Sequence, residues 1–210
     1  MNARTFNTPL TATTKDEWLT PPDIIRALGD FDLDPCAPVN RPWDMAKSHY
    51  SIADNGLALP WFGRVWLNPP YGDETFKWIQ RGAAHGNAMC LIFARTETKG
   101  FHNEVWAKAD AIFFFKGRLK FFHVDGREAG GAANAPSCIV AYGSSNVEAL
   151  RRAASTGLLR GRFIPLKSAM PPALPPPEAE DATGAFPSLP FADLARPSAF
   201  RPDDPPRFTA

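Results

Sequence analysis

The sequence predicts an α/β domain with a mostly parallel sheet, extending over residues 15–167. Segments with strand character alternate along the chain with segments of helical spacing, which is the pattern of parallel strands connected by helices. Two predicted strands, 88–93 and 111–115, are wholly apolar, as expected when helices cover both faces of a sheet. A third strand, 65–67, runs directly into Asn-Pro-Pro-Tyr, where two prolines force the chain out of the sheet.

The predicted elements follow one another in a regular order. A short helix covers 23–28, with Thr20 as its N-cap and Pro21 near its first turn. Apolar residues at helical spacing predict further helices at 75–84, 101–107 and 147–156. The predicted strands are 31–34, 65–67, 88–93, 111–115 and 138–142.

The two ends of the chain differ in composition from this middle part. Residues 1–14 are polar and rich in threonine, and we expect a disordered arm there. From Ser168 onward the chain holds half of its 22 prolines, in runs that favour polyproline II conformations. Residues 168–210 are therefore predicted to form a disordered tail.

Composition bounds the class of protein. A formal net charge of +1 suits a nucleic-acid enzyme only if its basic residues gather on one face. The cysteines Cys36, Cys90 and Cys138 form no C-x-x-C pair, so neither a zinc site nor a disulfide framework is indicated. The polar N-terminus does not resemble a secretory signal, and no apolar stretch reaches the length of a membrane span. We therefore expect an intracellular, cytoplasmic protein.

The loop Asn68, Pro69, Pro70 and Tyr71 carries the strongest functional signal. It follows the carboxyl end of a strand, where open α/β sheets bind their ligands. The Asn68 side-chain oxygen and the Pro69 carbonyl can each accept a hydrogen bond from a planar amine and favour its attack on an electrophilic methyl group. Tyr71 can stack on a base flipped out of a duplex. The alternative is a turn that merely ends the strand.

Three shorter motifs are compatible with a nucleotide-like cofactor. Asp34 ends a predicted strand and precedes a tight loop of small residues at 35–37, although no glycine-rich dinucleotide fingerprint is present. In segment 18–22, the Thr20 hydroxyl and two prolines can close over the amino-acid end of the cofactor. Asp54 lies in a turn and can accept a hydrogen bond from an adenine amino group. The plain structural alternatives are a solvated strand end, a helix N-cap and a turn.

The segment 116–136 is the most basic local stretch of the chain. Basic residues, among them Lys116, Arg118 and Lys120, are interleaved with aromatic ones. Such a stretch can bind a phosphate backbone. A solvated β-hairpin whose aromatic side chains face the core is an equally good interpretation.

Several other chemistries lack support in the sequence. The four histidines have no ligand-like spacing, and neither a hydrolase motif nor a P-loop is present, so a metal site or hydrolytic triad is not indicated. Cys36 has no supporting motif for a role as a nucleophile of the cytosine-C5 type.

In their order along the chain, these motifs resemble the phage-type, Dam-like family of DNA N6-adenine methyltransferases, over roughly residues 15–143. The resemblance is carried by 16–22, 33–37, 54–57, 64–72, 94–99, 101–102 and 116–121. It implies a Rossmann-like methyltransferase fold, S-adenosylmethionine as methyl donor, double-stranded DNA as partner, no metal, and a place in DNA modification or restriction-modification.

The resemblance also assigns roles to individual residues. It implies catalysis by Asn68, Pro69, Pro70 and Tyr71. It implies cofactor contacts from Trp18, Thr20, Pro21, Pro22, Asp34, Pro35, Cys36, Ala37, Asp54 and Asn68. DNA contacts are expected from Arg95, Lys99, Lys116, Arg118 and Lys120, with 116–136 as a small target-recognition segment.

Asn68 stands where many DNA enzymes have aspartate, which leaves the acceptor open. Cytosine N4, an RNA base and a protein glutamine are alternative acceptors for the same loop. A catalytically inert DNA-binding relative is a further alternative from another functional class.

Overall fold

The computed structural model describes residues 17–167 of the chain. The predicted arm at 1–14 and the predicted Pro-rich tail at 168–210 lie outside the described residues. None of the helices in the described part has the length and hydrophobicity that a transmembrane span requires.

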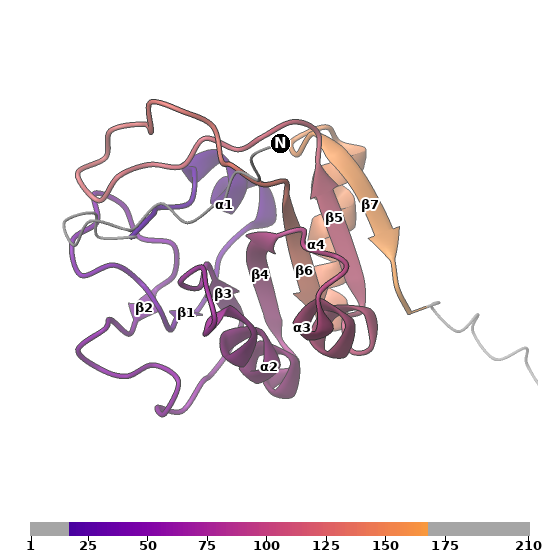
Figure 1. The fold of residues 1–210 in the computed structure, drawn as a ribbon, viewed down its shortest axis with the longest axis horizontal. Helices are drawn as coiled ribbons and strands as arrows, with labels where there is room; N and C mark the ends of the chain where they lie inside the picture. Colours follow the sequence, from indigo (N-terminus) through magenta and orange to yellow (C-terminus); the bar gives the residue numbers. More distant parts are fainter. Residues whose placement is uncertain (1–16, 168–210) are drawn as a thin grey trace, which may run out of the picture. The chain divides into compact units, whose positions relative to one another are not determined.

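A seven-stranded sheet forms the centre of residues 17–167 (Figure 1). Its strands are β1 Leu33–Asp34, β2 Ser48–His49, β3 Val65–Leu67, β4 Ala88–Phe93, β5 Ala111–Phe115, β6 Ser137–Tyr142 and β7 Gly161–Pro165. They lie side by side in the order β2-β1-β3-β4-β6-β5-β7. The strands predicted at 65–67, 88–93 and 111–115 are confirmed with the same bounds, whereas β2 and β7 were not predicted.

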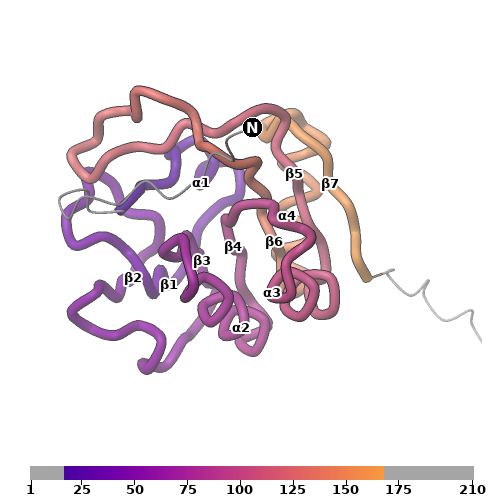
Figure 2. The backbone as a smooth tube through the Cα atoms, in the orientation of Figure 1, coloured from indigo at the N-terminus to yellow at the C-terminus, as the bar shows by residue number. Residues whose placement is uncertain are grey.

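The prediction of a mostly parallel sheet is wrong. Strands β1 to β4 pair in parallel, but β6 pairs antiparallel with β4 and β5, and β7 pairs antiparallel with β5. The reason lies in segment 116–136, which leaves β5 and enters β6 at the same edge of the sheet without an intervening helix (Figure 2). Such a connection reverses the chain, so β6 runs against both of its neighbours.

Helices pack on both faces of the sheet. One face is covered by α1 Pro22–Leu28 and α4 Ser144–Ser155. The other is covered by α2 Thr75–His85, the short α3 Lys99–Phe101 and the π-helix η1 His102–Trp106. The single helix predicted at 101–107 is therefore one α-helical turn followed by a π-helix.

The prediction that Thr20 caps α1 is wrong. Pro21 occupies the N-cap position, and no side chain caps the helix. Thr20 is fully buried, and its hydroxyl has no hydrogen-bond partner among the described residues. The helix needs less capping than most because Pro22, its first residue, has no N–H to satisfy.

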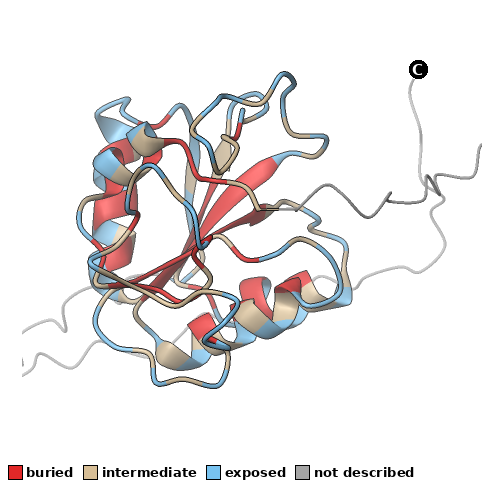
Figure 3. Ribbon diagram, turned by 90° about the vertical axis from the view of Figure 1, so that its left-hand side faces the viewer, coloured by how far each residue is buried: buried red, intermediate tan, exposed pale blue. Residues whose placement is uncertain are grey.

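Strands β1, β3, β4 and β6 are buried between these two helical layers (Figure 3). Side chains alternate along β4, so Met89 and Leu91 join the core beneath α1 and α4, whereas Cys90 and Ile92 join the core beneath α2. The expectation that apolar strands are covered on both faces is therefore confirmed.

The carboxyl ends of β1, β3, β4 and β5 lie along one edge of the sheet, the upper edge in Figure 1. Segment 116–136 runs across this edge, with Phe121 buried and the backbone of Phe122 bridged to Leu19. Because strand β1 is the direct neighbour of β3, the two loops that follow them meet at this edge.

Candidate active site

The loop after β3 is fixed by hydrogen bonds to its neighbours. The Thr75 hydroxyl donates to the Pro70 carbonyl at 2.8 Å and accepts from the Gly72 N–H at 3.0 Å. The Cys36 thiol donates to the Asn68 carbonyl at 3.4 Å. Two adjacent prolines remove much of the remaining backbone freedom. The polar groups of residues 68–71 therefore have fixed directions.

The Asn68 side chain is oriented by a residue far away in sequence. Its amide nitrogen donates to the Trp18 carbonyl at 2.9 Å. This contact requires the nitrogen on that side and so defines where the amide oxygen lies. The oxygen accepts a hydrogen bond from the Tyr71 hydroxyl at 3.3 Å. Because an amide oxygen has two lone pairs, it can accept a second hydrogen bond.

The Tyr71 ring lies in an aromatic cluster. Its ring stacks on Phe93 with the centroids 4.1 Å apart, and it packs edge-on against Phe121 with the centroids 6.3 Å apart. Burial raises the pKa of the Tyr71 phenol, which keeps the hydroxyl protonated as a donor to Asn68. Since Phe93 covers one face of the ring, another planar group could stack only on the opposite face.

The loop after β1 contains a buried carboxyl group. Asp34 is 2% exposed, and one of its oxygens accepts a hydrogen bond from the Cys36 N–H at 3.1 Å. Burial raises the pKa of Asp34 to about 7. Burial and the nearby Asp34 also raise the pKa of the Cys36 thiol well above its ordinary value. Cys36 is therefore a protonated thiol, unsuited to act as a nucleophile.

A cavity of about 680 Å³ lies between these two loops. All of 34–37 and all of 68–71 line it, as does Trp18. Further parts of the wall come from the loops after β1 and β2 and from α2, including Val39, Met45, Ile52, Asn55, Gly56 and Trp78. The structure thus brings the predicted catalytic loop and the predicted cofactor loop to one cavity.

The rest of segment 18–22 lies outside the cavity wall. Thr20, Pro21 and Pro22 do not line the cavity. The segment instead pairs with the basic segment, because Leu19 and Phe122 exchange backbone hydrogen bonds of 2.8 and 3.1 Å. The Trp18 ring packs against His123, with centroids 4.8 Å apart. Segment 18–22 therefore connects the cavity with segment 116–136.

Asp54 does not line the cavity either. Its exposed carboxylate accepts hydrogen bonds from the Ser51 N–H at 2.7 Å and from the Ser51 hydroxyl at 2.8 Å. Its neighbour Asn55, which has a positive φ of 54°, lines the cavity instead. In this structure Asp54 shapes the turn that carries Asn55.

All five predicted DNA-contacting residues are exposed, and none of them lines the cavity. Arg95 and Lys99 follow β4, and Lys116 and Arg118 follow β5. Lys120 differs from these four because it forms an ion pair with Glu128 at 3.2 Å.

Sequence reasoning missed several residues of the site. Thr75, which fixes the predicted catalytic loop, was predicted only as the start of a helix. Trp78 lies one turn later on α2 and lines the cavity. Val39 and Ile52 also line it and are 57% and 86% exposed. An exposed isoleucine or valine in a loop carries no recognisable motif, so only the structure reveals its place.

Among residues 17–167, no group of three or more His, Cys, Asp or Glu side chains is placed to hold a metal ion.

Comparisons with known proteins give one result. Neither the curated proteins nor the solved structures returned a match. A family model matches from residue 7 to residue 153 and includes every residue that forms the cavity. This model describes DNA N-6-adenine-methyltransferases (Dam), and because it covers well over half of the sequence, the chain belongs to this family.

Proposed function

We propose that this protein transfers a methyl group from S-adenosylmethionine to N6 of adenine at specific sites in double-stranded DNA. The fixed amide of Asn68 carries the proposal: its nitrogen is held by the Trp18 carbonyl, which leaves its oxygen as an acceptor at the cavity wall. Family membership supports adenine N6 as the atom that is methylated.

The cavity residues fit S-adenosylmethionine. The volume of about 680 Å³ lies within the range of roughly 300–1,000 Å³ that is usual for small-molecule sites. Asp34 supplies a carboxylate that can accept further hydrogen bonds from hydroxyl or amino groups. Val39 and Ile52 supply exposed apolar surface suited to a purine ring. When bound, the cofactor supplies an activated methyl group.

Asn68 and Pro69 would act on the amine that receives the methyl group. An exocyclic amine is a poor nucleophile because its lone pair is delocalised into the base. Two acceptors, the Asn68 side-chain oxygen and the Pro69 carbonyl, can bind its two N–H groups and favour a tetrahedral nitrogen with a localised lone pair. These hydrogen bonds strengthen as positive charge develops on the nitrogen, so they stabilise the transition state more than the ground state. The surplus proton leaves after transfer.

Tyr71 would hold the base itself. Adenine inside a duplex cannot reach a cavity of this kind, so the base must leave the stack. The base would stack on the ring face of Tyr71 opposite Phe93, and the Phe93 stack would hold the ring in place. Base–aromatic stacking of this kind contributes roughly 1–3 kcal/mol.

DNA would lie along the carboxyl edge of the sheet, over which segment 116–136 extends. Cations at this edge, Arg95, Lys99, Lys116 and Arg118, suit contacts with phosphates. We assign target recognition to 116–136 because it is joined to the cavity through Leu19 and Trp18. DNA as substrate places the protein inside a cell, in the host cytoplasm if the gene belongs to a phage.

The test is incubation with methyl-labelled S-adenosylmethionine and unmethylated duplex DNA, followed by nucleoside digestion and mass spectrometry. We expect labelled N6-methyladenine. Asn68→Ala should lower turnover by about 100-fold to 1,000-fold or more, as for other lost transition-state donors and acceptors, while cofactor binding stays measurable.

Asn103→Ala is the matched control, because it removes an exposed amide that does not line the cavity. It should methylate DNA at the wild-type rate. An Asn68→Ala variant with near wild-type turnover would refute the catalytic assignment. Labelled N4-methylcytosine would keep the mechanism but change the base.

A further inference from the structure

We propose that the DNA-contacting surface extends to the edge strand β7, where Arg162, and Arg160 directly before the strand, bind backbone phosphates together with Lys116. The inference rests on the proposed function and deepens it by assigning a second part of the DNA interface. Both arginines lie beyond residue 153, where the family match ends.

The first step concerns the charge of segment 116–136. Two of its cations are paired within the segment: Lys120 with Glu128 at 3.2 Å, and Arg127 with Asp125 at 2.7 Å. These pairs cancel the charge of the outer part of the segment. Within residues 17–167, the lysine and arginine side chains of the segment that form no ion pair are Lys116 and Arg118, at its base. The positive charge of the segment is therefore concentrated next to β7.

The second step concerns the pairing of β5 with β7. In this antiparallel pair Phe114 is opposite Arg162, and Phe115 is opposite Gly161. The next pair in the register is Lys116 with Arg160, and the Lys116 N–H donates to the Arg160 carbonyl at 2.8 Å. Like charges directly opposite each other on paired strands are destabilising, with Cβ atoms about 5 Å apart. A bound anion would relieve this repulsion.

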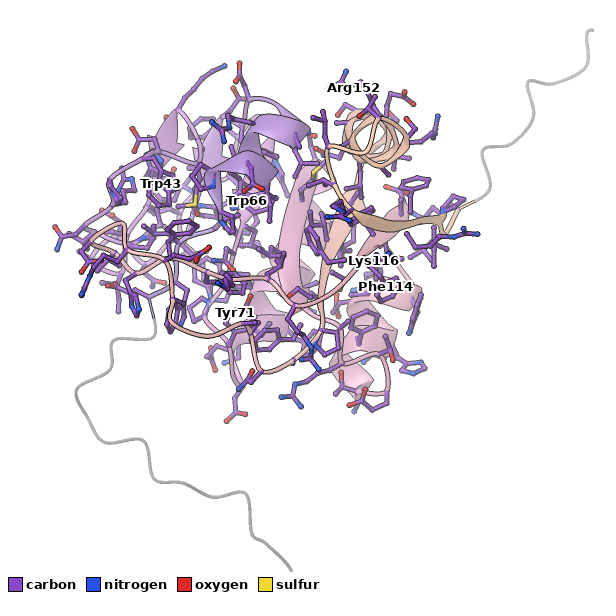
Figure 4. The ribbon with its side chains drawn as sticks, turned by 90° about the horizontal axis from the view of Figure 1, so that it is seen from above. Trp43, Trp66, Tyr71, Phe114, Lys116 and Arg152 are labelled. Atoms are coloured by element: carbon purple, nitrogen blue, oxygen red, sulfur yellow. The ribbon has the colours of Figure 1, made fainter. Side chains whose placement is uncertain are left out.

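The third step concerns the direction of these side chains. Residues two apart on a strand point to the same face, so Arg160 and Arg162 share a face with Lys116. None of the three has an ion-pair partner among the described residues, and both arginines are exposed. Figure 4 shows Lys116 and Phe114 at one end of the sheet, whereas Arg152 projects from the outer side of α4.

The last step is continuity with the active site. From β3, which precedes Asn68, the sheet continues through β4, β6 and β5 to β7. At about 4.8 Å per strand the distance is roughly 19 Å, or about six base pairs of duplex. One short DNA segment can therefore contact both regions. The acidic residue Asp110 lies at the other end of β5, directly before the strand begins, and forms an ion pair with Lys167 at 2.7 Å.

The test compares the salt dependence of duplex binding between the wild type and R160Q/R162Q. Loss of two phosphate contacts should reduce the slope of log affinity against log salt by about 1.8. Affinity should fall by about 200-fold at 0.05 M salt, with little difference near 1 M. R26Q/R152Q is the charge-matched control, since it removes two exposed cations from α1 and α4 on the other face of the sheet. R160K/R162K should keep the wild-type slope.

The outcomes separate the two proposals. A wild-type protein that forms no methylated nucleoside in DNA and binds no duplex overturns both. Wild-type methylation together with an unchanged slope in R160Q/R162Q overturns the β7 surface alone. A slope reduced equally in R26Q/R152Q also overturns it, because the effect would then reflect net charge rather than position.

Discussion

Replacing Asp34 with asparagine tests the electrostatics of the cavity without relying on turnover. Burial raises the folded-state pKa of Asp34 to about 7, from an ordinary value of 3.8. The folded protein therefore keeps a proton that the unfolded chain releases between these two pH values. The contribution of Asp34 to the free energy of unfolding is therefore highest below about pH 4, and it decreases as pH rises toward about 7. At about 1.4 kcal/mol per pKa unit, the loss is at most about 4 kcal/mol.

The assay is urea unfolding of both proteins at several pH values between 5 and 8. All other titrating groups are shared, so the difference in unfolding free energy isolates Asp34. The side-chain amide introduced by D34N stays neutral, and its oxygen can still accept the Cys36 N–H bond. We expect the variant to gain stability relative to the wild type as pH rises, with most of the change complete above about pH 7.

A difference that stays constant from pH 5 to pH 8 would refute the reasoning, because Asp34 would then have the same pKa in the folded and unfolded states. A stability advantage of D34N over the wild type that grows as pH falls would have the opposite pH dependence to the one expected. It would refute the reasoning as well. If the ionised carboxylate binds S-adenosylmethionine, the affinity of the wild type should also increase up to about pH 7, whereas that of D34N should not.

Two further substitutions test the geometry of the site. Thr75→Val removes the hydroxyl that holds Pro70 and Gly72. The free energy of unfolding should fall by about 1–3 kcal/mol, and kcat should fall by tenfold or more. Thr75→Ser keeps the hydroxyl and should stay near the wild type in both measurements. Gly56→Ala would place a Cβ atom against the carbonyl oxygen of Pro35, so we expect weaker cofactor binding by calorimetry and a lower melting temperature. Wild-type values for both would show that the backbone around Pro35 can move to accommodate the Cβ atom.

The parts of the fold that could be predicted are those with a strong local pattern. The short apolar runs Ala88–Phe93 and Ala111–Phe115 have the length and composition of strands covered on both faces. The edge strand Gly161–Pro165 has no such pattern, because it is mostly exposed and contains an arginine and a terminal proline. The direction of β6 could not be predicted from the sequence either, since it depends on the long connection 116–136 between β5 and β6, which contains no helix.

The same division applies to the site. Motifs 34–37 and 68–71 could each be predicted to follow the end of a strand; the structure adds that these strands are neighbours, so both loops line one cavity. Contacts from distant segments could not be assigned. Ile52 reaches the cavity from an irregular loop, and the pairing of Lys120 with Glu128 shifts the free positive charge to the base of the basic segment.

The contact between Asn68 and Trp18 gives a physical reason for an asparagine at the head of this loop. A carboxylate at position 68 would place an oxygen against the Trp18 carbonyl, so that two acceptors would face each other without a proton between them. The amide avoids this conflict, because its nitrogen donates to the carbonyl while its oxygen stays at the cavity wall. Leu19, the neighbour of Trp18, is hydrogen-bonded to Phe122. The direction of the Asn68 oxygen therefore depends on the position of segment 116–136. If segment 116–136 moves when DNA binds, the backbone of Leu19 and Trp18 would transmit that movement to the Asn68 amide.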